Sequence, residues 1–305
     1  MPVATRDINR RIRSIANTKK ITKAMEMVSA SKMRKAVNAV LATREYSNAA
    51  WDLVKDLSAK TDPSHHVLLQ KRDDVKNIGV IMFTSNRGLC AGFNREIVEQ
   101  VAKYLKKYQS DGKEVGADIF LMGKKGREIN YRYNYKVVAD FEKSDVAENV
   151  LEITPLAKMV IADYISGKYD KVVVAYTDYE SAVSQKPRIR RLLPIEREDD
   201  ELGFVSDDKP SKEDKEEMKE FEYIFEPSPD AVLEQMLNRL IELQIYQALL
   251  ESNASEHSAR MLAMRNASDA AGDMIDDLTL YFNQARQQAI TSELADISAG
   301  RAAVE

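Results

Sequence analysis

Few side chains in this sequence have the types and spacing that catalysis needs. There are three histidines, His65, His66 and His257, and one cysteine, Cys90. His65 and His66 follow a proline break and are expected in solvent, whereas His257 falls on the seam of a predicted helix, where a polar residue can set the register. No histidine is near Cys90 in the sequence, so a buried thiol is favoured over a nucleophile. The sequence predicts no catalytic residue, no cofactor and no metal site.

Two glycine-containing loops are the remaining candidates for a ligand site. Ser85–Asn94 follows a predicted strand, at the sheet edge where α/β proteins bind ligands. Gly123–Gly126 follows another strand, where a helix N-terminus can hold a phosphate. Neither loop has the Gly-x-x-x-x-Gly-Lys-Ser/Thr or Gly-x-Gly-x-x-Gly spacing of a nucleotide-binding loop. Ordinary turns before helices, allowed in the first loop by Gly88 and Gly92, are the favoured interpretation, and a ligand site is the alternative.

A long C-terminal helix is predicted after Pro229, because the remaining 76 residues contain no proline and only two glycines, Gly272 and Gly300. Seam positions recur at alternating steps of four and three, a 3.5-residue period that specifies a left-handed coiled coil. At ~1.5 Å per residue the helix would be ~110 Å long, more than a compact domain requires. The seam is Met236, Leu240, Leu243, Gln247, Leu250, Ala254, His257, Met261, Met264, Ser268, Ala271, Ile275, Leu278, Phe282, Ala285 and Ala289.

Its predicted partner is the N-terminal segment, residues 3–62, which has no glycine or proline between Pro2 and Pro63. Large apolar residues, among them Ile21, Val28 and Leu41, form a helical stripe along it. If both helices leave one end of a central domain, they run antiparallel, with residue 60 opposite 229 and residue 3 opposite 286. Residues 287–305 would then project as a single helix.

Charge is divided unevenly although the net charge is only −4. Residues 1–35 hold ten Lys or Arg against two acidic residues, and residues 228–305 hold five Arg against twelve acidic residues. A basic arm can bind nucleic acid, but the acidic helix of the same chain is the favoured partner. The predicted register places Arg11 and Arg13 near Asp276 and Asp277, and Lys19 and Lys20 near Asp269.

The middle of the chain changes to a strand pattern. Short apolar runs at 78–83, 119–122, 137–139 and 172–176 alternate with helical stretches at 94–109, 124–131 and 150–166, which predicts an α/β sheet. Ser181–Leu193 is expected to add an edge strand interrupted by Pro187. Residues 196–222 hold thirteen acidic and five basic residues and are expected to form a solvated linker.

The predicted fold class is α/β plus a long coiled coil: an antiparallel two-helix coiled coil from both termini with a central Rossmann-like α/β domain. The predicted divisions are the N-terminal coiled-coil helix 1–62, the α/β foot domain 75–195, an acidic linker 196–227 and the C-terminal coiled-coil helix 228–305. No apolar stretch reaches the ~18 residues that span a membrane. The single cysteine excludes an internal disulfide and suits a reducing compartment.

Three segments carry a family resemblance over essentially the whole chain. Ile21–Arg34 resembles the N-terminal motif of the gamma subunit of F-type (proton-translocating) ATP synthases. Arg87–Asn94 is similar to that family's mid-domain motif, and Ile290–Ile297 with Gly300 and Ala302-Ala303 to its C-terminal signature. The motifs occur in the family's order. Ser298 and Arg301 depart from the pattern, standing where the family usually has an apolar and a small residue.

The resemblance implies a non-catalytic rotor subunit of the central stalk, one copy per complex. It would couple rotation of the membrane c ring to the catalytic cycle of the beta subunits, in ATP synthesis or hydrolysis. The implied partners are the alpha and beta subunits, the epsilon subunit and the c ring. The implied location is the cytoplasmic face of the bacterial plasma membrane, peripherally and through partners alone. Implied contacts with the alpha–beta head are Met25, Arg260, Arg286, Gln287, Thr291 and Glu293, and those at the foot, over the c ring and epsilon, are Tyr223 and Glu226.

Two other function classes stay open from the residues themselves. A nucleotide-binding α/β enzyme with helical arms would bind a ligand saturably as an isolated chain. A coiled-coil nucleic-acid binder would show salt-sensitive binding through residues 6–35.

Overall fold

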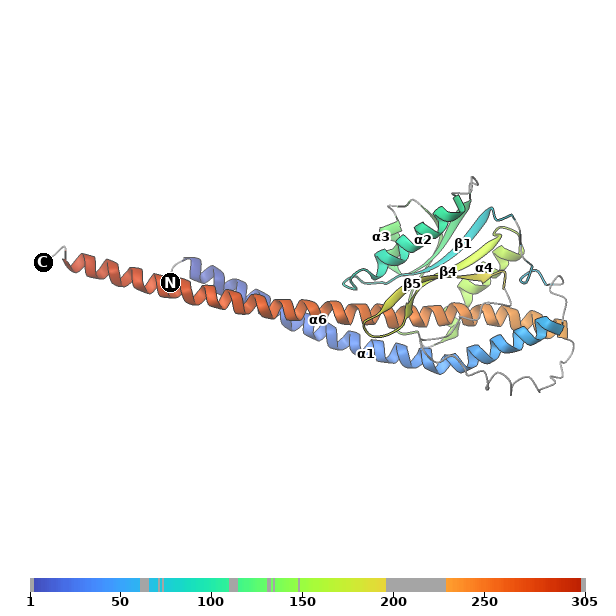
Figure 1. Ribbon diagram of the computed structural model, residues 1–305, viewed down its shortest axis with the longest axis horizontal. Helices are drawn as coiled ribbons and strands as arrows, with labels where there is room; N and C mark the ends of the chain where they lie inside the picture. Colours follow the sequence, from blue (N-terminus) through green and yellow to red (C-terminus); the bar gives the residue numbers. More distant parts are fainter. Residues whose placement is uncertain are drawn as a thin grey trace. The chain divides into compact units, whose positions relative to one another are not determined.

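A computed structural model describes residues 3–60, 66–70, 72, 74–109, 115–130, 133, 135–147, 149–195 and 229–302. Two long helices enclose an α/β segment in chain order, as predicted (Figure 1). The chain forms two compact units, one of residues 1–29 with 260–305 and one of residues 30–259. The elements are α1 (Val3–Lys60), β1 (Asn77–Phe83), α2 (Phe93–Gln109), β2 (Gly116–Met122), α3 (Lys124–Asn130), β3 (Lys136–Phe141), η2 (Val150–Glu152), α4 (Thr154–Ile165), β4 (Lys171–Tyr179), β5 (Gln185–Leu193) and α6 (Pro229–Ala302).

The unit of residues 30–259 is built on a five-stranded sheet of order β3-β2-β1-β4-β5. The first four strands are mutually parallel, and β5 runs antiparallel to β4. Every residue of β1 after Asn77 is buried, which is why this strand reads as a continuous apolar run. All four predicted parallel strands are present.

Helices cover both faces of this sheet (Figure 1). On one face α2 packs Ile97, Val101 and Leu105 against β1 and β2, a spacing of four that makes one helical stripe. On the other face α4 and the first part of α6 complete a larger core. The α/β arrangement predicted for the middle of the chain is confirmed, and the core also takes in Val40 and Ala50 of α1.

The prediction that Pro187 interrupts the last strand is wrong. β5 continues through Pro187, which lies opposite Thr177 of β4. Proline is tolerated because β5 is the edge of the sheet, where the missing N–H need not donate to a further strand.

The predicted seam of α6 is confirmed along its length. Each of its sixteen positions from Met236 to Ala289 is buried or half-buried. In the unit of residues 1–29 and 260–305, Thr22 Oγ1 donates to Ser268 Oγ at 3.1 Å. In the other unit, Thr43 Oγ1 donates to Gln247 Oε1 at 2.8 Å. Both pairs lie within one residue of the predicted antiparallel register.

The apolar stripe predicted for α1 is partly wrong. Ile21, Val28 and Leu41 are 60 %, 56 % and 48 % exposed. Small residues hold the inner positions instead, with Ser29 3 % and Ala36 1 % exposed. Ile21 and Val28 each precede an inner position by one residue, a rotation of about 100° that turns them outward.

The predicted ion pairs between the two long helices are also not formed. Among the described residues, none joins Arg11 or Arg13 to Asp276 or Asp277, or Lys19 or Lys20 to Asp269. Lys19 instead lies beside Gly272, where a Cβ atom would stand 2.8 Å from its Nζ. Exposed pairs contribute only ~0–1 kcal/mol, so seam packing rather than charge holds this register.

Candidate functional site

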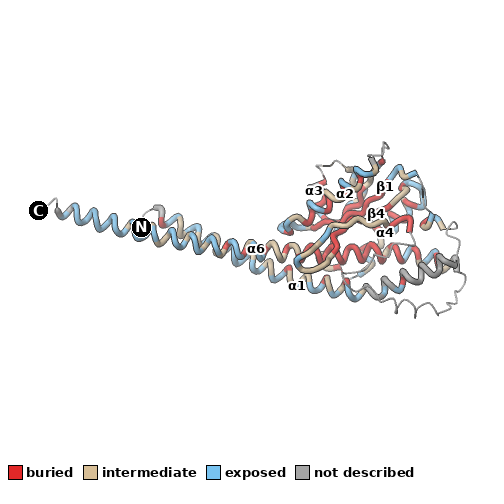
Figure 2. Tube along the Cα trace, viewed as in Figure 1, coloured by how far each residue is buried: buried red, intermediate tan, exposed pale blue. Residues whose placement is uncertain are grey.

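The end of α6 is the longest fully exposed stretch among the described residues. Residues 290–299 are all exposed (Figure 2), including Ile290, Leu294 and Ile297, which lie on one helical face. Residues 1–29 do not cover this stretch, as the register predicts. An exposed helix with apolar and small side chains has few intramolecular contacts, so its surface is available to partners.

Four of the residues implied by the resemblance stand at the start of this end. Arg286, Gln287, Thr291 and Glu293 are exposed. Gln287 and Thr291 line a shallow hollow together with Gln284 and Gln288. The four lining residues are spaced i, i+3, i+4 and i+7, so they form one polar face of the helix. Amide and hydroxyl groups there can donate to or accept from a partner.

The other implied residues have different surroundings. Met25 is half-buried and Arg260 is buried, 7 % exposed. Only a small part of the Arg260 residue therefore reaches the surface of the chain. Tyr223 and Glu226, like the acidic segment 196–222, lie outside the described residues.

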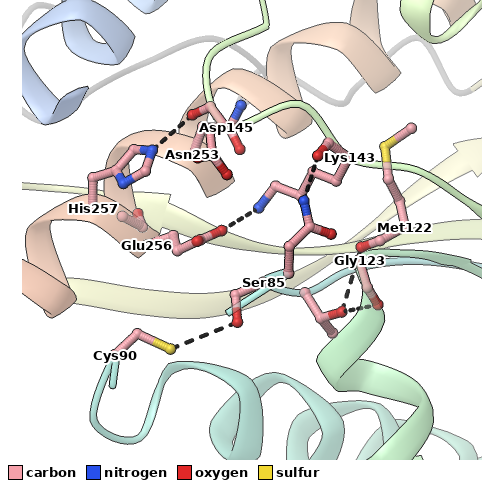
Figure 3. Close-up of polar contacts among 12 residues, drawn as sticks. Ser85, Cys90, Met122, Gly123, Lys143, Asp145, Asn253, Glu256 and His257 are labelled. Atoms are coloured by element: carbon pink, nitrogen blue, oxygen red, sulfur yellow. Dashed lines mark hydrogen bonds and ion pairs between the residues drawn. The ribbon is translucent and has the colours of Figure 1, made fainter. Parts of the chain in front are cut away.

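The loop after β1 is held together by its own side chains, and Figure 3 shows one of these contacts, between Ser85 and Cys90. The Ser85 N–H donates to Asn94 Oδ1 at 2.8 Å, and Asn94 Nδ2 donates to Ser85 Oγ at 2.7 Å. Leu89 and Ala91 have positive φ, 63° and 48°. The left-handed backbone of this turn is thus carried by non-glycine residues rather than by Gly88 or Gly92.

The loop after β2 is also occupied by the chain itself. Gly123 has φ 111°, a conformation that favours glycine. At the start of α3, the Lys125 N–H donates to Ser85 O at 2.9 Å and the Gly126 N–H donates to Thr84 Oγ1 at 3.1 Å. The amides that would bind a phosphate are used within the protein, which supports the interpretation of this loop as an ordinary turn.

Cys90 and His257 are both buried. The Cys90 thiol lies 3.7 Å from Ser85 Oγ. His257 Nε2 donates to the Asp145 carbonyl oxygen at 2.7 Å, so this hydrogen bond reaches the segment after β3 rather than α1. Burial lowers the pKa of His66, which is half-buried rather than solvated as predicted. Within the described ranges, no group of three His, Cys, Asp or Glu side chains is placed to hold a metal ion.

The sequence reasoning missed a buried polar stretch of α6. Residues 243–258, here called the enclosed segment, are all buried (Figure 2). Glu251 is 3 % exposed beside Asp178 of β4. Burial first, then the negative charge of Asp178 and hydrogen bonding with it, raise the pKa of Glu251 to about 8. Asp178 also accepts from Arg188 Nε at 2.8 Å.

A signal for this burial was present in the sequence. Apolar residues occupy all faces of the helix between Leu240 and Leu250 rather than one stripe. A helix that is apolar all round is buried all round, so the polar residues that follow should also have been expected inside.

Known proteins resemble this chain over its full length. A family model described as ATP synthase matches residues 4–304. The ATP synthase gamma chain of Herpetosiphon aurantiacus is 40 % identical, with 99 % of each chain covered. That of Coxiella burnetii strain RSA 493 is 38 % identical over 98 % of this chain and 99 % of its own. The chain belongs to the ATP synthase gamma-chain family. Gamma chains are non-catalytic subunits of the central stalk of F-type ATP synthase, so the chain is associated with a membrane-bound complex.

Solved structures share the fold of this gamma chain at lower identity. A chain of the Euglena gracilis mitochondrial ATP synthase, described as OSCP/F1/c-ring in rotational state 3, has a TM-score of 0.62 at 17 % identity, covering 99 % of this chain and 94 % of its own. A chain of the Tetrahymena thermophila enzyme, described as central stalk/c ring, has a TM-score of 0.58 at 23 % identity, covering 81 % and 99 %. Among the described residues of this gamma chain, no helix is apolar over enough length to cross a bilayer.

Proposed function

We propose that this chain turns as a rotor inside its ATP synthase, coupling rotation of a membrane c ring to the catalytic cycle of the beta subunits. The observation that carries the proposal is α6 itself. One unbroken helix, Pro229–Ala302, packs under the sheet at one part of its length and is exposed on every face at another. A single helix of this kind connects the α/β domain, which partners can bind, to an exposed end that can rotate among other partners.

Rotation would act through the asymmetry of this helix. Different faces of α6 and α1 carry different side chains, so each beta subunit would meet a different surface at each angle. A rotor shifts a conformational equilibrium only by the difference in contact free energy between the two states. We assign these contacts to Met25 and Arg260, and to Arg286, Gln287, Thr291 and Glu293.

In the segment before α6 we assign Tyr223 and Glu226 to contacts with the c ring and the epsilon subunit. The chain would then lie on the cytoplasmic face of the bacterial plasma membrane, held there by partners and present once per complex. Phosphoryl chemistry would belong to the beta subunits.

The test is rotation of a reconstituted complex of this chain with alpha and beta subunits. Lys103 is exposed on α2, whereas Cys90 is 2 % exposed, so Lys103→Cys gives one reactive thiol for a gold probe. ATP should drive rotation of the probe in one direction, and ADP should not. A chain that fails to assemble, or a probe that stays still while the complex hydrolyses ATP, would contradict the proposal.

The two alternatives predict different results with the isolated chain. Saturable nucleotide binding measured by calorimetry would favour an α/β enzyme. Binding of DNA or RNA that weakens steeply with salt would favour the basic arm as a nucleic-acid site.

A further inference from the structure

Residues 142–147, which follow β3 and are here called the connector, have an irregular backbone but several buried side chains and hydrogen bonds. Lys143 is 4 % and Ala147 1 % exposed. An irregular segment gains no ladder or helical hydrogen bonds of its own, so its buried polar groups must find partners elsewhere. The partners lie mainly on the two long helices, as Figure 3 shows for α6.

The strongest contact is a buried ion pair with α6. Lys143 Nζ lies 2.8 Å from Glu256 Oε2, with the side chains 1 % and 5 % exposed. The same ammonium lies 5.7 Å from the centre of the Phe93 ring. Charges removed from water to this extent persist only when paired, because an unpaired one costs several kcal/mol.

Asp145 ties the connector to both helices. Its carboxylate accepts from Lys32 Nζ of α1, and its carbonyl oxygen accepts from His257 Nε2 of α6 at 2.7 Å. The hydrogen bond from Lys32 outweighs partial burial and holds the pKa of Asp145 below its ordinary value. The carboxylate is therefore charged at neutral pH and bonded to a helix that is distant in sequence.

Two further carbonyl oxygens of the connector accept hydrogen bonds from α6. Asn253 Nδ2 donates to Ser144 O at 3.3 Å, and the Tyr246 hydroxyl donates to Ala147 O at 3.4 Å. Tyr246, Asn253 and His257 are seven and four residues apart, so they share one face of α6. We call the contacts of the connector with α1 and α6 the clamp.

The clamp differs in kind from the packing around it. Apolar packing is non-directional, so one smooth surface can slide over another while much of the contact persists. Hydrogen bonds and ion pairs weaken steeply with angle and distance, and a broken buried pair leaves charges without water. A clamp of directional contacts therefore resists sliding and twisting more than the same area of apolar contact.

The turn between β4 and β5 gives a natural comparison. Ser258 Oγ of α6 donates to Ala182 O at 2.7 Å and accepts from Gln185 Nε2 at 3.3 Å. Those contacts are neutral and reach α6, whereas the connector carries charges and reaches α1 as well.

We propose that the connector is the torque-bearing joint of the chain, locking the sheet to α1 and α6 so that a force turning one turns the other. This inference rests on the proposed rotary function. It assigns Lys32, Lys143, Asp145 and Glu256 as positioning residues that touch no nucleotide.

The test uses the reconstituted holocomplex in vesicles. A chain without the charges of the clamp, here called clamp-free, carries Lys32→Met, Lys143→Met, Asp145→Asn and Glu256→Met. These substitutions remove the charges in pairs, and only the hydrogen bonds from Tyr246, Asn253 and His257 to backbone carbonyls of the connector remain. ATP hydrolysis without an ion gradient should stay within about twofold of the native complex, because an unloaded rotor needs little torque. ATP-driven pumping against an imposed gradient should fall about tenfold or more, as hydrolysis continues without transport. Ser258→Ala, which removes the neutral contacts of the β4–β5 turn, should keep pumping and hydrolysis in their native ratio.

A reversible covalent link separates torque transfer from simple stability. Ser144→Cys and Asn253→Cys, added to the clamp-free chain with Cys90→Ser, would join the connector to α6 by a disulfide. Oxidation should restore pumping under load to within about twofold of native, and dithiothreitol should abolish it again in the same vesicles. A role limited to assembly would leave the ratio of pumping to hydrolysis unchanged in both states.

Pumping by the clamp-free complex at the native ratio would overturn the inference, as would a disulfide that forms without restoring pumping. If the clamp-free chain does not assemble, Lys32→Met with Asp145→Asn leaves the buried pair intact, and native pumping under load by that variant would overturn the inference too. Failure of the native chain to assemble or pump would instead contradict the proposed function.

Discussion

Two stretches of α6 have similar side chains and opposite surroundings. The enclosed segment ends in Glu251-Ser-Asn-Ala-Ser-Glu-His-Ser258, and the stretch 290–299, here called the exposed segment, contains Thr291-Ser-Glu-Leu-Ala-Asp-Ile-Ser298. Both mix acidic, hydroxyl and small residues. Every residue of the first is buried, and every residue of the second is exposed.

The difference lies in what surrounds the helix. The enclosed segment meets the sheet, the connector and α1, and its polar atoms bond to named groups on each. In the exposed segment, Thr291 Oγ1 donates only within its own helix, to Gln287 O at 2.9 Å. The same residue types are thus required for the structure in the enclosed segment and are solvated in the exposed segment. Substitutions should therefore lower the free energy of unfolding in the enclosed segment and leave it nearly unchanged in the exposed segment.

The largest difference in free energy of unfolding is expected when one acidic residue of each segment is replaced by alanine. Glu256→Ala leaves Lys143 buried without its counter-charge, which should lower the free energy of unfolding by ~3–5 kcal/mol. Glu293→Ala, on the exposed segment, should change it by less than ~0.5 kcal/mol. Urea unfolding of the full chain, followed by circular dichroism, measures both. Equal effects would show that the enclosed pair is not buried in solution.

For activity, in contrast to stability, substitutions at the exposed end should have the larger effect. Arg286→Ala with Gln287→Ala removes donors at the start of the exposed end, where a hydrogen bond to a charged partner contributes ~1.5–3 kcal/mol. Turnover and pumping by the reconstituted complex should fall, while unfolding of the isolated chain stays native. Deleting residues 300–305 serves as the control and should leave turnover largely intact. If the truncated chain lost activity while the Arg286→Ala, Gln287→Ala variant behaved like the native chain, the functional contact would lie at the helix tip instead.

Adding volume offers a third comparison. Ala254 is fully buried, so Ala254→Leu should overpack the enclosed segment and lower the free energy of unfolding by ~1–3 kcal/mol. Ala295 is exposed, and Ala295→Leu should be neutral to within ~0.5 kcal/mol. The same unfolding measurement decides. A destabilised Ala295→Leu chain would reveal packing against that helix end which the structure does not contain.

The sequence predicted periodic features well. The seam of α6, its register with α1 and the four parallel strands follow from repeat patterns of apolar residues, because a period is a property of one element and needs no knowledge of the others. The predicted apolar stripe of α1 was wrong at some positions, because Ser29 and Ala36 are buried there while Ile21 and Val28 are exposed. Small residues allow close approach of helices, but they give no signal on a hydrophobicity pattern.

The clamp could not be predicted in the same way. Its members, such as Lys32, Asp145 and Glu256, come from three separate parts of the chain, and each is an ordinary surface residue type when read alone. Only the tertiary fold removes Glu256 from water and supplies its partner. The implied contact residues on α6 were recognised by family resemblance and were not found by reasoning from period or composition.

A dependence of stability on pH tests the enclosed segment without disrupting it. The pKa of Glu251 is raised to about 8 in the folded chain, first by burial and then by Asp178, against 4.5 for the free side chain; Arg190 and Gln247 act in the opposite direction. Between these two values the folded chain holds a proton that the unfolded chain has released. Stability from this group is therefore fully present below pH ~4.5 and declines as pH rises towards ~8, by at most ~1.4 kcal/mol per pH unit.

Glu251→Gln should flatten that decline, because an amide keeps the shape and a donor for Asp178 but does not ionise. Urea unfolding of the full chain at pH 5, 6, 7 and 8 gives the slope for each variant. Glu293→Gln, in the exposed segment, should leave the native slope unchanged. Parallel slopes for the native and Glu251→Gln chains would mean that Glu251 ionises inside the fold as readily as in water, and that water reaches the enclosed segment after all.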